Sequence, residues 1–205
     1  MADQYLTIES PGTGVYKEKG SRFLGFAFPV RDEDSIRAHL SSLQKEHHSA
    51  RHCCYAWRLN PEKTDYRMND DGEPSGSAGK PIYGQIVSRD LTDLLVVVVR
   101  YFGGIKLGVG GLIQAYRTAA SEALDQTRII RRRVFDRLKV EFQYEQMNRV
   151  MQVVKEFKLD FEDQHFELEC SLIVKSWRRQ TPQVLDKFST ISGCTTEIIN
   201  EKSQY

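Results

Sequence analysis

The sequence lacks long apolar runs. Its longest, residues 94–99, is far shorter than the ~20 residues that a membrane-spanning helix requires, so we expect no membrane association. The N-terminal residues also lack the basic region and the apolar segment of a secretory signal. Together these absences predict a cytoplasmic protein.

The sequence has almost no net charge. It carries 29 Lys and Arg against 28 Asp and Glu, which leaves +1. Residues 1–128 hold 16 basic and 16 acidic side chains, and residues 129–205 hold 13 and 12. A protein that coats nucleic acid by bulk electrostatics has a strongly basic body instead. Any anion-binding site must therefore be local.

Cysteines are few and match no known metal-binding or disulfide pattern. Cys53, Cys54, Cys170 and Cys194 form no CxxC pair, which disfavours a zinc ribbon and a disulfide framework and favours reduced thiols. The histidines near Cys53 match no zinc signature. We therefore expect neither a metal site nor a cofactor.

The chain does contain the patterns of an α+β protein with two domains, residues 1–130 and 131–205. The first domain shows strands within residues 16–30 and 53–59, with a helix between them that begins near Asp32. Residues 60–81 read as a long irregular loop. The β-branched run over residues 94–102 predicts a strand covered on both faces, followed by a glycine-rich loop and a helix that carries Leu112.

The second domain follows an arginine-rich crossing over residues 128–137. Alternating strands are predicted near residues 138–144 and 166–174 and a last strand over residues 195–199, with helical faces over residues 147–157 and 184–188. Residues 158–162 are taken as one further short strand, which completes the order. This order is βαββαβ, the ferredoxin-like arrangement.

Residues 103–111 include five glycines between the buried strand and the helix. Glycine permits positive φ and the close approach of a ligand or of another backbone segment. A helix N-terminus offers N–H groups to a phosphate or carboxylate. Neither nucleotide motif matches, since Gly79-Lys80 precedes Pro81 and Ile113 occupies the place of the third glycine. A nucleotide enzyme is therefore not expected, and a tight strand-to-helix turn is the alternative interpretation.

Two further segments carry charge. Asp70, Asp71 and Glu73 suit Mg²⁺ or acid–base chemistry, although the EF-hand spacing fails and a solvated acidic turn is the simpler interpretation. The arginines of residues 128–137 suit phosphate contacts, or else a helix C-terminus followed by an exposed strand.

The motifs over residues 52–57, 70–81 and 99–112 closely resemble those of the IMPACT family, and within it the bacterial YigZ-like branch. The resemblance implies a first domain similar to the second domain of ribosomal protein S5, an α/β sandwich. It implies a second domain similar to a ferredoxin-like domain of elongation factor G. Eukaryotic relatives regulate translation largely through an additional RWD domain, which the sequence lacks, so we do not expect that role to carry over. The family supplies no accepted catalytic residues.

Our leading hypothesis is a non-enzymatic, translation-associated protein that binds RNA or the ribosome; a protein partner in translation control is the other candidate. The predicted ligand-facing loop comprises Arg100, Tyr101, Gly103, Gly104, Lys106, Gly108 and Gly110. The predicted opposite wall comprises His52, Asp70, Asp71, Glu73, Ser77 and Lys80. The predicted nucleic-acid contacts are Arg128, Arg131, Arg132 and Arg133.

Two alternatives stay open at the level of the sequence. One is a hydrolase that acts on a small phosphorylated or peptide-like substrate with Asp70, Asp71, Glu73 and His52 at its site. The other is an architectural role, in which Asp71 and Glu73 cap helices or pair with Arg100.

Overall fold

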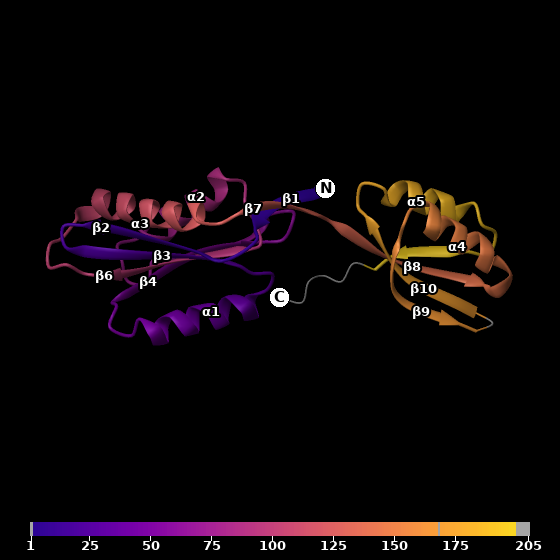
Figure 1. Ribbon diagram of the computed structural model, residues 1–205, viewed down its shortest axis with the longest axis horizontal. Coiled ribbons are helices and arrows are strands. Elements are labelled where there is room, and N and C mark those ends of the chain that lie inside the picture. Colours follow the sequence, from indigo (N-terminus) through magenta and orange to yellow (C-terminus); the bar gives the residue numbers. More distant parts are fainter. Residues whose placement is uncertain (1, 168, 200–205) are drawn as a thin grey trace. The chain divides into compact units, whose positions relative to one another are not determined.

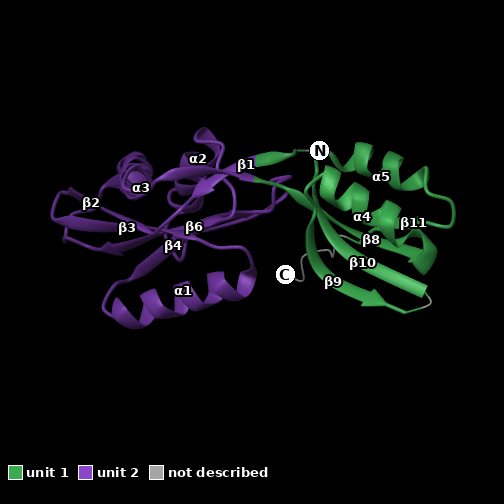
Figure 2. Cartoon of the chain, turned by 45° about the vertical axis from the view of Figure 1, so that its right-hand side comes forward, with its two compact units in different colours: residues 1–4, 133–204 green, residues 5–132, 205 purple. Residues whose placement is uncertain are grey.

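The computed structural model describes residues 2–167 and 169–199, which fold as two compact units (Figures 1 and 2). The first unit comprises residues 5–132. The second comprises residues 133–199, apart from 168, together with residues 2–4. The sequence predicted an α+β protein, and the mixture of helices and sheets confirms it.

The first unit is built on a five-stranded antiparallel sheet in the order β2-β3-β6-β4-β5. Its strands are β2 (Gly12–Glu18), β3 (Ser21–Pro29), β4 (His52–Leu59), β5 (Asp65–Asn69) and β6 (Leu94–Tyr101). Helix α1 (Glu33–Glu46) covers one face, and α2 (Gly79–Ser88) and α3 (Gly108–Asp125) cover the other (Figure 1). Strand β6 lies at the centre and is buried on both faces, as its apolar run predicts.

Two clusters of buried side chains hold these layers together. Alternate residues of β6 face opposite ways, so that Val96 and Val98 pack toward α2 and α3, whereas Val97 and Val99 pack toward α1. Helix α1 begins where Asp32 accepts a hydrogen bond from the backbone N–H of Ser35 at 2.7 Å, which caps the helix as the acidic start of this segment predicts.

Several elements of the first unit differ from the sequence predictions. Strands β1 (Gln4–Ile8) and β7 (Ile129–Arg133) pair in a two-stranded sheet, where the sequence predicted no first strand and only a crossing. Strand β5 and the start of α2 lie inside the stretch predicted to be irregular. β5 is a five-residue edge strand in which Tyr66 and Met68 alternate with polar residues, but both are exposed and the segment is too short for this alternation to stand out.

The second unit is a four-stranded antiparallel sheet in the order β11-β8-β10-β9. Its strands are β8 (Phe135–Gln143), β9 (Asp160–Phe166), β10 (Glu169–Trp177) and β11 (Thr195–Ile198). A 3-10 turn (Tyr144–Gln146) leads into α4 (Met147–Glu156), and α5 (Thr181–Ser189) connects the last two strands. Both helices lie on one face of the sheet (Figure 1), which is the predicted ferredoxin-like βαββαβ arrangement.

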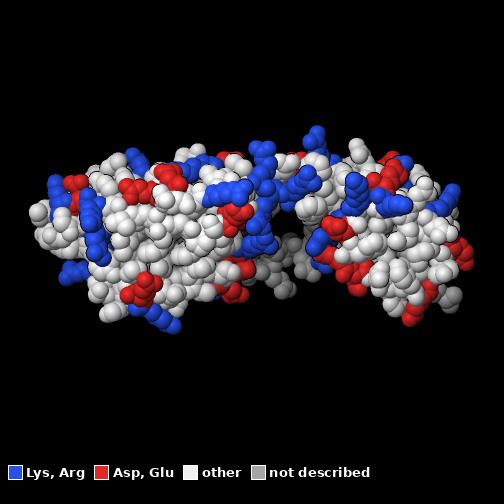
Figure 3. Space-filling model, in the orientation of Figure 1, with Lys and Arg blue, Asp and Glu red and all other residues white. Residues whose placement is uncertain are grey.

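Charged side chains are spread over the surface. Acidic and basic residues are interspersed on the visible face (Figure 3), in keeping with the balanced composition. The predicted arginine contacts are partly engaged in the protein itself: Arg128 pairs with Glu9 at 3.1 Å, and the Arg133 guanidinium lies 4.8 Å from the centre of the Trp177 ring. In the described part of the chain, no helix combines the length and apolar character required to cross a membrane.

Candidate functional site

The first unit contains a cleft of about 440 Å³ where β6 ends and α3 begins. The start of β4 and the loop that follows β5 form its other side. The residues that line it are Arg51, His52, Glu73, Pro74, Arg100, Phe102, Lys106, Leu107, Gly108, Val109 and Leu112.

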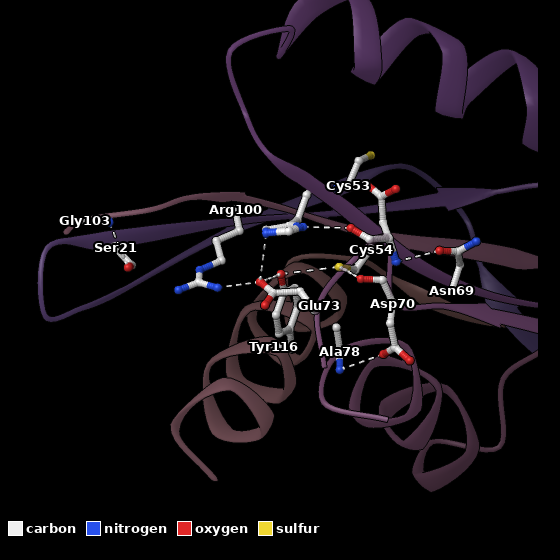
Figure 4. Close-up of polar contacts among 12 residues, drawn as sticks. Ser21, Cys53, Cys54, Asn69, Asp70, Glu73, Ala78, Arg100, Gly103 and Tyr116 are labelled. Atoms are coloured by element: carbon white, nitrogen blue, oxygen red, sulfur yellow. Dashed lines mark hydrogen bonds and ion pairs between the residues drawn. The ribbon is translucent and has the colours of Figure 1, made fainter. Parts of the chain in front are cut away.

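A buried ion pair lies at the floor of this cleft (Figure 4). Nη1 of Arg100 donates to Oε1 of Glu73 at 2.6 Å, and the side chains are only 7% and 3% exposed. The hydroxyl of Tyr116 donates to the same Glu73 oxygen at 2.8 Å. These bonds join the loop after β5 to strand β6 and helix α3.

The ion pair with Glu73 leaves one hydrogen-bond donor of Arg100 without a partner in the part of the chain that the structure describes. Its Nε is buried and has no hydrogen-bond partner among the described residues. Its guanidinium carbon lies 5.4 Å from the ring centres of both Phe23 and Phe102, so aromatic faces flank the charge. A buried donor without a partner costs free energy and calls for an explanation, such as a bound group that the site normally holds.

His52 is held in a defined tautomer by the protein backbone. Its Nδ1 lies 2.7 Å from the carbonyl oxygen of Asp71. Because a carbonyl oxygen only accepts, Nδ1 carries the proton, and the neutral ring has a basic Nε2. That Nε2 lies 4.0 Å from Oε1 of Glu73, on the side of the cleft.

The two adjacent cysteines are buried thiols. Cys54 Sγ donates to the carbonyl oxygen of Asp70 at 3.0 Å and lies 3.4 Å from the Tyr116 hydroxyl. Burial raises the pKa of Cys54, and burial together with the charge of Asp71 raises the pKa of Cys53 to about 11. Burial also raises the pKa of Tyr116, and the neighbouring Cys54 and Glu73 raise it further. Neither thiol has the thiolate character of a reactive cysteine.

Asp70 caps helix α2 rather than facing the cleft. Its Oδ1 accepts from the backbone N–H groups of Ala78 at 3.0 Å and Gly79 at 2.8 Å, and its Oδ2 accepts from Gly76 at 2.8 Å. Burial alone would raise the pKa of Asp70, but these three backbone hydrogen bonds outweigh it, and the pKa lies below its usual value. This acidic loop is therefore an ordered part of the fold.

Helix α3, in contrast, begins without a cap. Among the residues that the structure describes, no side chain caps its first N–H groups, and its first turn holds no acidic residue. Gly104 and Gly108 lead into it with φ of +90° and +73°, a conformation that favours glycine. The N-terminus of α3 thus presents free backbone donors beside Lys106 and Gly108 of the cleft.

Comparison with known proteins identifies the family of this chain. A family model described as the Impact N-terminal domain matches residues 19–124 of the 205. The chain is 34% identical to the IMPACT family member YigZ of Escherichia coli (strain K12) over 147 residues, which covers 71% of this chain and 72% of YigZ. The chain belongs to the IMPACT family.

A solved structure shares the fold of this chain over nearly its whole length. A crystal structure described as that of a hypothetical protein is 27% identical, with a TM-score of 0.75 over 98% of this chain and 100% of its own. Yih1, described as a two-domain translational regulator, is 26% identical over 60% of this chain and 47% of its own, with a TM-score of 0.36. At that TM-score, the structure of Yih1 assigns no position or role to any residue of this chain.

The cleft brings together part of the predicted site of this IMPACT family member. From the predicted ligand-facing loop, Arg100, Lys106 and Gly108 line the cleft. From the predicted opposite wall, His52 and Glu73 line it. The remaining predicted residues have other positions: Tyr101, Gly103, Gly104, Gly110, Asp70, Asp71, Ser77 and Lys80 are not among the lining residues.

Tyr101 and Gly103 are structural. The hydroxyl of Tyr101 lies 2.9 Å from Nδ1 of His47 at the end of α1, on the sheet face opposite Arg100. The N–H of Gly103 donates to Oγ of Ser21 at 3.0 Å (Figure 4), so it is not free to bind an anion. A Cβ at Gly103 would lie 1.9 Å from the backbone carbon of Gly20, which explains why only glycine fits there.

Three residues of the predicted opposite wall, Asp71, Ser77 and Lys80, have positions away from the cleft. Asp71 accepts from the Cys53 N–H at 2.6 Å and so fixes the loop against β4. Ser77 is fully buried, and its hydroxyl has no partner among the described residues. Lys80 is exposed on α2. The architectural interpretation named Asp71 and Glu73, and of these Glu73 does pair with Arg100. Asp71 instead binds the backbone of β4, and the helix cap is Asp70.

Several residues of the site were missed from the sequence. Tyr116 sits on the apolar stripe of α3 and was counted as core, although a tyrosine in a stripe of alanines signals a hydroxyl that needs a partner. Arg51 lies directly beside a motif, and Pro74 and Val109 lie within motifs, but none of the three had a signal of its own. Residues 2–167 and 169–199 contain no cluster of three or more His, Cys, Asp and Glu that suits a metal ion.

Proposed function

We propose that this IMPACT family member is a non-enzymatic protein that binds RNA, free or within the ribosome, through the cleft between β6 and α3. The observation that carries the proposal is the buried guanidinium of Arg100. It lies at the floor of an open cleft with an unpartnered Nε, beside the uncapped N-terminus of an 18-residue helix. Guanidinium groups and helix N-termini are both donors to phosphate.

The charge of the cleft is local and positive. Glu73 compensates Arg100, so the excess charge comes from Arg51 and Lys106 on the cleft walls. This arrangement agrees with a protein of balanced composition, in which an anion site must be confined to one place. The glycines at the start of α3 leave room for a phosphate backbone to approach the helix, since a Cβ on Gly108 or Gly110 would meet nothing within 4 Å.

The translation context of the proposal comes from the family. Members include Yih1, which is described as a translational regulator. Ribosomal or transfer RNA is therefore the ligand that we propose for the cleft, and ribosomes are the assembly. Arg131 and Arg133 are exposed but do not line the cleft, and we propose them as separate contacts for nucleic acid.

Salt-dependent binding of RNA tests this proposal. We expect the full chain to bind transfer RNA and ribosomal RNA fragments at ~50 mM salt, where phosphate contacts are strongest, with an affinity that falls linearly with salt on logarithmic axes. Arg51→Ala combined with Lys106→Ala should lower that slope by about 2. Lys45→Ala on α1, which covers the opposite sheet face, is the matched control. A complete lack of RNA binding at low salt would refute the proposal.

A hydrolase is the second candidate, and the orientation of His52 favours it. A histidine whose Nδ1 is held by a carbonyl has its basic Nε2 available for proton transfer, here 4.0 Å from a buried carboxylate. No hydroxyl or thiol of the described residues hydrogen-bonds to His52, so water would have to be the nucleophile. Hydrolysis of phosphorylated or peptide-like substrates that His52→Gln abolishes would favour this candidate over the binding protein.

A further inference from the structure

Most of the cleft wall is apolar. Pro74, Phe102, Leu107, Val109 and Leu112 contribute to it, and they outnumber the cations Arg51, Arg100 and Lys106. Apolar side chains add nothing to a surface that contacts only phosphates, because phosphate contacts are made by cations and backbone donors in water. The ligand of the cleft must therefore have an apolar part as well as an anionic part.

An aromatic ring lies exposed at this wall. Phe102 is 43% exposed and Val109 54%, although both are large hydrophobic residues. The Arg100 guanidinium lies 5.4 Å from the centre of the Phe102 ring, so a planar cation and an aromatic ring occur together. Aromatic rings and guanidinium planes are the two surfaces on which proteins stack unpaired RNA bases.

The size of the cleft limits what enters it. Its volume of about 440 Å³ lies at the lower part of the range for small-ligand sites, roughly 300–1,000 Å³. This space suits a single nucleotide. A base within a duplex remains stacked and paired, and cannot insert its flat face against Phe102.

We infer that the cleft receives one unpaired nucleotide of an RNA strand. Its base lies against Phe102 and the neighbouring apolar wall, and its phosphate lies near Lys106 and the N-terminus of α3. This inference rests on the proposed function and adds to it a preference for single-stranded RNA over duplex RNA. It also assigns Phe102 as the residue that contacts the base.

Substitution of Phe102 tests the inference in the full chain. The probe is a short, fluorescently labelled single-stranded RNA of mixed sequence, measured across a salt series. Phe102→Ala should weaken binding by about fivefold or more, which is the range for loss of one stacked base, and should leave the salt slope unchanged. Phe102→Trp should restore binding. Ile105→Ala is the matched control, because Ile105 is 56% exposed in the same loop but does not line the cleft.

Competition by small ligands provides the second measurement. Nucleoside 5′-monophosphates should displace the labelled RNA at lower concentration than ribose 5-phosphate, and the same RNA annealed to its complement should bind more weakly. Equal competition by ribose 5-phosphate, together with unchanged binding by Phe102→Ala, would overturn the inference. If the salt slope still depended on Arg51 and Lys106, the proposed function would survive that result. Absence of any RNA binding would overturn both.

Discussion

Arg100 and Glu73 form an ion pair, 2.6 Å from Nη1 to Oε1, that is buried beneath an open cleft. Removal of two charges from water is expensive, and it is tolerated only where the geometry and additional hydrogen bonds compensate. Here Tyr116 supplies a further donor to the same carboxylate oxygen. The pair fixes the position of Arg100 at the floor of the cleft, so it links the stability of the first unit to the geometry of the cleft.

Loss of the Glu73 carboxylate should destabilise the protein strongly. Glu73→Ala leaves the Arg100 charge buried and unpaired, which costs about 3–5 kcal/mol of unfolding free energy. Urea denaturation followed by circular dichroism measures the loss. The double variant Glu73→Leu with Arg100→Met should be more stable than Glu73→Ala, because no charge remains buried. A loss below about 1 kcal/mol for Glu73→Ala would mean that the pair is solvated.

Loss of the cap on α2 should cost less and should depend on pH. Asp70→Ala removes the acceptor of three backbone N–H groups, for which we expect about 1–2 kcal/mol. Because the folded-state pKa of Asp70 lies below its usual value of 3.8, the contribution of the carboxylate is fully present above that value. It is lost as the pH falls through the folded-state pKa. The gap in stability between parent and Asp70→Asn, measured by denaturation from pH 7 downward, should therefore shrink below about pH 4; a constant gap would contradict the prediction.

Two glycines near the cleft should respond differently to alanine. Gly103→Ala places a Cβ 1.9 Å from the backbone of Gly20, so β6 and the β2–β3 turn must separate, and a clear loss of thermal stability is expected. Gly110→Ala meets nothing within 4 Å in the first turn of α3, and should be neutral or stabilise by about 0.4–1 kcal/mol. Equal effects of the two substitutions on the melting temperature would argue against the close approach at Gly103.

The tautomer of His52 is open to direct measurement. Since Asp71 offers only a carbonyl oxygen to Nδ1, the neutral ring should carry its proton on Nδ1. Nitrogen-15 chemical shifts of the imidazole report which nitrogen is protonated. A neutral ring protonated on Nε2 would be incompatible with this contact and would remove the basis for His52 as a base in the hydrolase candidate.

Elements with strong periodicity were predicted well from the sequence. The buried strand β6, the capped helix α1 and strands β8 and β10 of the second unit follow from apolar patterns that tertiary packing preserves. Strand β9 is exposed throughout, and the sequence placed it over residues 158–162, where it completes the βαββαβ order, rather than over Asp160–Phe166. Strands β1, β5 and β7 were missed because they are short, at sheet edges or in a two-stranded ribbon, and carry few buried side chains. Their pairing partners lie far away in sequence, which no local pattern reveals.

The candidate site was predicted only in part, for a similar reason. The motifs indicated which segments form the site. The direction in which each side chain points, however, is set by strand alternation and loop conformation. Arg100 and Tyr101 are adjacent in sequence, yet β6 directs one into the cleft and the other toward α1. Of the three acidic residues in the loop after β5, only Glu73 faces the cleft, because Asp70 and Asp71 are used as acceptors for backbone N–H groups.

The most direct test of the proposed site is the mapping of RNA contacts by amide chemical shifts in the full 23.6-kDa chain. If RNA binds in the cleft, addition of a short single-stranded RNA should shift the amide signals of Gly108, Val109 and Gly110 at the N-terminus of α3, together with that of Arg100. Amides of α1, on the opposite face of the sheet, should not shift. Saturating RNA that shifts only residues outside the cleft, such as Arg131, would contradict the assignment of this site.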